Sequence, residues 1–151
     1  MVELRRRLAR HALVGLDTSL WIYHLEGDPR YLPLTTGILS RVQTGRPSGI
    51  VSVITIMELT VRPYRLNKPD VAAHYEALLS HFPNLVIADT TQDIARRAAQ
   101  LRAAYSLKTA DALLVATCLI AGATAWITND HALRRLSPTI DPILLDDFLT
   151  R

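Results

Sequence analysis

Short apolar runs recur along this chain, and a helix-like segment separates each run from the next. The runs lie at residues 12–16, 49–53, 85–88, 124–128 and 143–145. Runs this short are typical of strands buried on both faces of a sheet. Strands that alternate with helices predict an α/β fold with three layers, α/β/α, around a central and mainly parallel sheet.

Start and stop signals give approximate bounds for the helices between these strands. The helices are expected at residues 19–26, 32–43, 69–81, 91–105, 109–121 and 130–136, with a further one that carries Glu58. That further helix should end near Arg62, because Pro63 cannot continue it. Thr18, and either Thr90 or Thr91, are the expected N-caps, and Gly122 suits the position after a helix end.

Four acids stand where a strand ends or the next helix begins: Asp17, Glu58, Asp111 and Asp130. Each has mainly apolar or small neighbours, where a carboxylate is costly to bury unless a cation offsets its charge. The carboxyl ends of parallel strands form one edge of a sheet, so we expect the four acids to converge there. A divalent metal is the usual cation in such a group. The alternative is that each acid is an ordinary first-turn acid or cap.

Length and composition limit the fold and the partners. The 151 residues predict one domain, 1–151, with residues 1–11 as a basic N-terminal extension. The net charge is +3, and 15 arginines stand against two lysines. Arginine binds phosphate through two parallel donors, so this bias suits a nucleic-acid partner. A GC-rich genome that favours arginine codons would produce the same bias.

Two features bear on the compartment. Cys118 is the single cysteine and lies in an apolar run, so we expect a buried structural thiol and a reducing, cytoplasmic compartment. Residues 112–127 carry no charge, but the segment is short, is broken by Gly122 and begins beside Asp111. We therefore expect a buried helix and strand there, and no membrane span.

Four motifs in this order resemble those of the PIN-domain ribonucleases, and within them the VapC-type toxins of bacterial toxin–antitoxin pairs. They are Leu-Asp-Thr-Ser at 16–19, Met-Glu-Leu at 57–59, Lys-Thr-Ala-Asp-Ala at 108–112 and Ile-Thr-Asn-Asp at 127–130. The similarity in order, context and spacing runs from about residue 12 to the C-terminus. The chain departs from the family at His131 and Ala132, where another acid is common, and in its longer arginine-rich start.

The resemblance implies a PIN-like fold and a metal-dependent endoribonuclease, with Mg²⁺ or Mn²⁺ held by Asp17, Glu58, Asp111 and Asp130. It also implies cleavage of single-stranded or structured RNA, a homodimer, and inhibition by a cognate small antitoxin whose tail occupies the catalytic groove. The residues themselves suggest supporting roles. Thr18, Thr128 and Asn129 would orient water or phosphate, and Arg62, Arg65 and Lys108 are candidate RNA contacts.

The alternative reading is a non-catalytic PIN-like module that binds RNA or a protein. The intact group of four acids favours the enzyme. Metal-dependent cleavage that is lost on changing Asp17 would separate the two readings.

Overall fold

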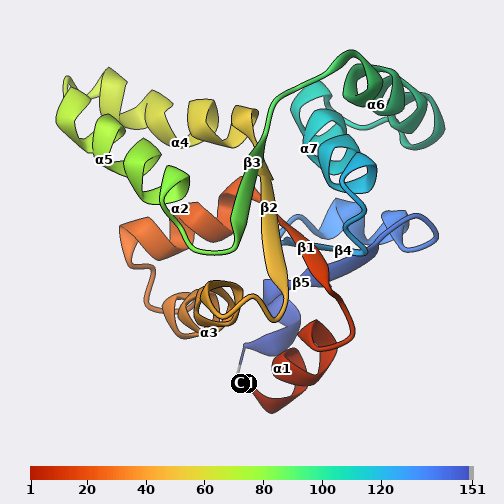
Figure 1. Ribbon diagram of the computed structural model, residues 1–151, viewed down its shortest axis with the longest axis horizontal. Coiled ribbons are helices and arrows are strands. Elements are labelled where there is room, and N and C mark those ends of the chain that lie inside the picture. Colours follow the sequence, from red (N-terminus) through yellow and green to blue (C-terminus); the bar gives the residue numbers. More distant parts are fainter. Residues whose placement is uncertain (150–151) are drawn as a thin grey trace.

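The central sheet of the computed structural model, which describes residues 1–149, has five strands that all run parallel (Figure 1). They are β1 (Leu13–Leu16), β2 (Ser48–Ser52), β3 (Leu85–Ala88), β4 (Ala125–Thr128) and β5 (Asp141–Leu144). The predicted α/β class is confirmed, and the sheet is wholly rather than mainly parallel. The last two positions of the expected 1–151 domain lie outside the described residues.

Helices cover both faces of the sheet, which confirms the three-layer arrangement (Figure 1). Val14 and Leu16 of β1 pack in a core with α1 (Val2–Leu8), α2 (Thr18–Glu26) and α3 (Leu32–Gln43). Ile50 and Trp126 face the other way and pack against α6 (Gln92–Tyr105) and α7 (Thr109–Ile120). Two short 3-10 helices, η1 (His131–Leu136) and η2 (Leu145–Phe148), precede and follow β5.

Helix α4 (Val53–Arg65) continues past the point where the sequence predicted its end near Arg62, so that prediction is wrong. Pro63 lies in its last turn, where the missing N–H removes a single helical bond. The turn is still closed, because the N–H of Leu66 donates to the carbonyl of Arg62 at 3.1 Å. The Pro63 ring is buried, and α4 packs against α5 (Pro69–Ser80).

The arginine-rich N-terminal segment forms α1 and is packed rather than solvated. Leu4 and Leu8 are each 1% exposed and belong to the main core. Arg7 donates to Asp141 and to the carbonyl of Pro142 on β5. Helix α1 is therefore tied to the sheet by apolar burial and by an ion pair.

Within residues 1–149, no single helix is long and apolar enough to cross a membrane. Helices α6 and α7 have the length and composition of a membrane span only when taken together, and the pair is bent by 119°. Most of α7 packs in the core, as expected, including Leu114, Val115 and Cys118.

The spatial order of the strands, β3-β2-β1-β4-β5, reverses direction between β1 and β4. After β1 the chain builds β2 and β3 on one side, then crosses back to place β4 and β5 on the other. Ligand sites in open parallel sheets lie at the carboxyl ends of the strands beside such a switch point. Asp17 follows β1 directly, and Asp130 follows β4 by two residues.

Gly15 should be a sensitive test of the β1–α7 packing. A Cβ on Gly15 would overlap Cys118 Sγ and lie 2.7 Å from Trp126 Cε3. We expect Gly15→Ala to lower the free energy of unfolding by about 1–3 kcal/mol, the usual cost of overfilling a core. Denaturant unfolding measures it. Gly37→Ala on α3 is the control: its Cβ meets only the flexible end of Met1, and the change should stabilise by up to about 1 kcal/mol. Equal effects of the two substitutions would contradict this account of the packing.

Candidate functional site

Asp17 is held at the carboxyl end of β1 by its backbone and by its side chain. Its N–H donates to the Ile127 carbonyl of β4 at 2.9 Å, which extends the β1–β4 pairing. One carboxylate oxygen accepts from the Thr18 N–H at 2.8 Å. The other accepts from the hydroxyls of Thr128 at 2.6 Å and Ser19 at 3.1 Å. Four hydrogen bonds therefore fix this residue at the switch point.

Asp17, and not Thr18, is the N-cap of α2, so the predicted cap is corrected. Thr18 is the first residue of the helix. Its N–H has no partner within the helix and donates to the Asp17 carboxylate. This leaves the buried Thr18 hydroxyl for another partner, and it donates to Glu58 Oε1 at 2.7 Å. Thr18 thereby links the first acid to the second, across from β1 to α4.

Thr128 makes the corresponding link to Asp130. Its hydroxyl donates to Asp17 and accepts the backbone N–H of Asp130 at 3.1 Å. The Asp130 carboxylate caps η1 by accepting the Ala132 N–H at 2.9 Å. The expected helix at 130–136 thus starts one residue later, as a 3-10 helix. Two threonines, Thr18 through its N–H and hydroxyl and Thr128 through its hydroxyl, therefore connect three of the four acids.

The effects of neighbouring charges on pKa values indicate that Asp111 lies near Asp17 and Asp130. Burial raises the pKa of Asp17 to about 6, and the charge of Asp111 adds to this effect, although the hydrogen bonds from Thr128, Ser19 and Thr18 oppose it. Burial and the charge of Asp130 raise the pKa of Asp111, while Lys108 lowers it. The carboxyl edge therefore concentrates negative charge that favours binding either a proton or a cation.

The donor set suits a hard divalent cation, although its side chains are not preassembled around one point. Within residues 1–149, no set of three or more His, Cys, Asp or Glu side chains is arranged to hold a metal ion. Oxygens of Asp17 and Glu58 are instead turned toward threonine hydroxyls. Mg²⁺ prefers oxygen ligands and keeps several waters, so one or two direct carboxylates are enough. The chemistry of the residues present therefore fits the ion that the sequence suggested.

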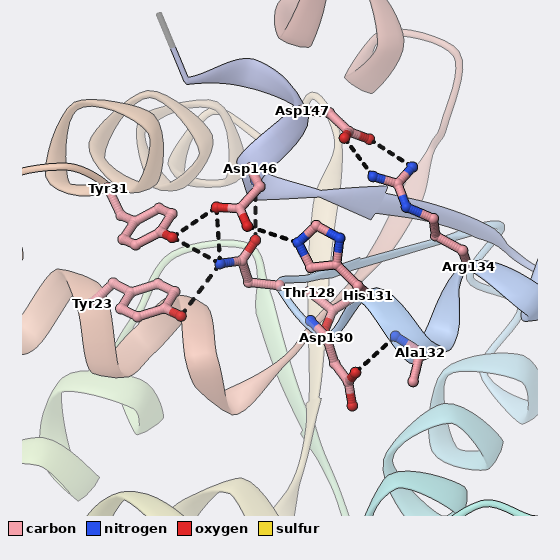
Figure 2. A network of polar contacts seen from close by, with 10 residues as sticks. Tyr23, Tyr31, Thr128, Asp130, His131, Ala132, Arg134, Asp146 and Asp147 are labelled. Carbon is pink, nitrogen blue, oxygen red and sulfur yellow. Dashed lines mark hydrogen bonds and ion pairs between the residues drawn. The ribbon is translucent and has the colours of Figure 1, made fainter. Parts of the chain in front are cut away.

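Asn129 does not join the acids, in contrast to the role suggested for it as a support for water or phosphate. Its Nδ2 donates to Tyr31 Oη at 3.0 Å and to Asp146 Oδ1 at 3.3 Å, and its Oδ1 accepts the Asp146 N–H at 3.0 Å. The side chain instead ties the end of β4 to the start of η2. Figure 2 shows the stacked pair Tyr23 and Tyr31 beside Asp146.

Asp146 is a polar residue of this edge that the sequence reasoning missed. It accepts from Tyr31 Oη at 2.7 Å and lies 2.7 Å from His131 Nε2 (Figure 2). Hydrogen bonds from Tyr31 and His131 hold its pKa below the usual value. The rule that located the other acids would have found it, because Asp146 directly follows the predicted strand 143–145. His131 is thus engaged with Asp146 and remains largely exposed.

The three candidate RNA contacts differ in their surroundings. Lys108 immediately precedes α7, close enough to Asp111 to lower the pKa of that carboxyl. Arg62 forms an ion pair with Glu26 of α2. Arg65 is exposed, one turn further along α4. Lys108 therefore lies at the acids, and the two arginines lie along α4 beyond Glu58.

A groove of about 500 Å³ runs beside Glu58, between α2, α4 and α5. Its lining is mainly apolar, with Ile22, Leu25, Leu59, Val71 and Tyr75 among the contributors. Charged side chains of both signs line it as well: Glu26, Glu58, Arg62 and Lys68. An extended or helical peptide with apolar anchors would suit such a groove.

The model of one protein family, the PIN domain, matches residues 14–137 of this chain. No curated protein matches it. Several solved structures share its fold. One is a toxin-antitoxin complex from Klebsiella pneumoniae, with 23% identity, a TM-score of 0.66, and coverage of 87% of this chain and 97% of the matched chain.

Two further structures with this fold are of complexes bound to DNA. VapBC2 from Rickettsia felis, bound to a DNA fragment from its promoter, has 16% identity and a TM-score of 0.69 over 86% of this chain and 96% of the other. DNA-bound VapBC from Salmonella typhimurium has 21% identity and a TM-score of 0.65 over 87% and 97%. At these identities the likeness concerns the fold. The family match covers most of the chain and both motif-bearing strand ends, so this protein belongs to the PIN domain family.

Proposed function

We propose that this protein is a metal-dependent endoribonuclease that hydrolyses phosphodiester bonds of single-stranded or structured RNA. The observation that carries the proposal is the partly buried Asp17 carboxylate, whose pKa is raised to about 6 and which is linked through Thr128 to Asp130. Retaining a carboxylate where burial disfavours its charge is typical of functional sites. Family membership supports the same reading.

In this proposal Asp17, Glu58, Asp111 and Asp130 hold Mg²⁺ or Mn²⁺, some of them through water. The bound ion would supply an acidified water and neutralise charge on the phosphate. Thr18 and Thr128 keep two of the carboxylates in fixed orientations through the hydrogen bonds at 2.7 and 2.6 Å. Lys108, whose charge acts on Asp111, would contact a non-bridging phosphate oxygen. The protein would thereby hold a phosphate against two carboxylates of fixed orientation.

Replacing Asp17 with asparagine should separate function from stability. We expect Asp17→Asn to abolish cleavage of RNA, because one ligand charge is lost from a side chain of the same volume. In EDTA at pH 7.5, however, the variant should unfold at a higher temperature than the wild type, because it no longer buries a charge. Mn²⁺ should raise the melting temperature of the wild type and have little effect on the variant.

The stability difference should also depend on pH in a defined direction. The pKa of Asp17 is about 6 in the folded state and 3.8 for an ordinary aspartate, so the folded state binds more protons between these values. The free energy of unfolding of the metal-free wild type should therefore fall as pH rises from about 4 to 6. Asp17→Asn should lack this part of the pH dependence. Parallel pH profiles for the two proteins, or full nuclease activity of the variant, would contradict the proposal.

Arg62 and Arg65 would hold the RNA strand beyond the acids. We expect Arg62→Ala combined with Arg65→Ala to weaken RNA binding across many sequences in the Asp17→Asn background. The log–log dependence of affinity on salt should flatten by roughly 0.7 units for each phosphate that the variant no longer binds. Filter binding or fluorescence anisotropy at several salt concentrations measures both. Arg96→Ala combined with Arg97→Ala, on α6, removes the same charge and should leave the slope unchanged. An unchanged slope in the Arg62 and Arg65 variant would place the RNA path elsewhere.

We further propose that the protein is the toxin of a toxin–antitoxin pair and forms a homodimer. The groove offers a small antitoxin a surface that includes Glu58, so a peptide tail bound there would cover one of the four acids and would block RNA. The fold shared with the Klebsiella pneumoniae toxin-antitoxin complex supports this reading. A non-catalytic binding module would use the same groove without needing the four acids.

Expression in a bacterial host tests toxicity independently of the assay for cleavage. The wild-type protein alone should arrest growth, and Asp111→Ala should relieve the arrest at equal soluble protein levels. The reason is that Asp111 contributes charge to the metal site while being only partly buried, so its loss leaves the fold intact. Growth and soluble expression are followed in parallel. Harmless expression of the soluble wild type would count against a toxin and leave nuclease activity to be judged by the cleavage assay.

A further inference from the structure

A second hollow lies at the opposite edge of the sheet, where the strands begin. It has a volume of about 340 Å³ and lies between the end of α1, the end of α3 and the turn before β2. Its lining includes His11, Arg41 and Arg46. The four acids at the carboxyl edge contribute nothing to it, and the proposed nuclease chemistry does not use it.

The acid in contact with His11, Asp141, is already engaged by other groups. The Asp141 carboxylate accepts hydrogen bonds from Arg7 Nε at 3.2 Å and from Arg7 Nη2 at 2.5 Å. It also lies 3.1 Å from His11 Nε2. The other ring nitrogen of His11 lies 2.8 Å from Thr124 Oγ1. The imidazole is therefore held in the wall of the hollow, and the Asp141 charge is offset by Arg7.

The arginines of the hollow, in contrast, have no acidic partner. Across residues 1–149, no carboxylate forms an ion pair with Arg41 or Arg46, or with Arg10 at the end of α1. The turn is held against α3, because the Arg46 N–H donates to the Arg41 carbonyl at 3.2 Å. The backbone therefore brings two guanidinium-bearing residues to one side of the hollow.

Arg41 also has an unsatisfied donor beside the hollow. Its Nε is buried and has no hydrogen-bond partner in the described part of the chain. A buried N–H without an acceptor is unfavourable, and a charged donor more so. The Nε–H and one Nη–H of a guanidinium form a fork that fits two oxygens of a phosphate.

We propose that this hollow is a phosphate-binding site, separate from the acids. A phosphate presents several acceptor oxygens and so can accept hydrogen bonds from both arginines at once. The volume falls at the lower end of the range of small-ligand pockets, which fits a phosphate or a mononucleotide rather than a larger cofactor. The phosphate can belong to a free ion or nucleotide, or to the backbone of an RNA strand.

Nuclear magnetic resonance titration of the full chain tests the proposal. With EDTA present to prevent metal-dependent cleavage, the protein is titrated separately with inorganic phosphate, with adenosine monophosphate and with a short single-stranded RNA. The amides of Ala9, Ala12 and Gly45, which line the hollow, should shift and saturate. Binding of phosphate and the nucleotide as tight as that of RNA would identify a small-molecule site; saturation by RNA alone would identify a backbone contact.

Two variants localise the effect to the arginines. Arg41→Gln should weaken binding by about tenfold, the scale of one charge-assisted hydrogen bond. Arg46→Gln should weaken it similarly, and Arg46 is exposed, so this variant stays folded even if Arg41→Gln does not. Arg97→Gln on α6 removes the same charge elsewhere and should bind as the wild type does. Absence of saturable shifts with all three ligands, or unchanged affinity in Arg46→Gln, would overturn the proposal.

Discussion

The pairing of β1 with β4 is the constraint on which the rest of this protein depends. These strands are far apart in the sequence, yet their register places Leu16 beside Ile127, and the Asp17 N–H extends the pairing by one more bond. That single register brings Thr128 within 2.6 Å of the Asp17 carboxylate. A slip of one residue would turn Thr128 to the other face of the sheet and break the link between the acids.

Gly15 has no side chain, and this leaves room for α7 to pack closely against β1. The strand must approach Cys118 and Trp126 closely, and a side chain at this position would occupy the same space. The close approach packs α7 against β1, and α7 carries Asp111 in its first turn. The core on one face of the sheet and the acids at its edge are therefore parts of one arrangement, and neither can be moved without the other.

Charge is divided between the two edges of the sheet. The carboxyl edge holds Asp17, Glu58, Asp111 and Asp130, and burial, together with the charge of a neighbouring acid, raises the pKa of Asp17 and of Asp111. At the opposite edge, α1 and the hollow beside it are rich in arginine, with Asp141 neutralised by Arg7. An acidic centre by itself repels a polyanion, so basic groups outside it are what would keep a nucleic acid close to the protein.

The sequence by itself determined the α/β class, the five strands, most helix bounds and the four acids as candidates. It could do so because the spacing of apolar residues and the position of an acid at a strand end are local features of the sequence. Only the tertiary structure decided the strand order, the burial of α1 and the continuation of α4 past Pro63, because these depend on packing against distant segments. The same holds for side-chain direction. Asn129 turns to Asp146 and away from the acids, while Thr128 turns toward Asp17, and hydrogen-bond partners supplied by other elements determine both.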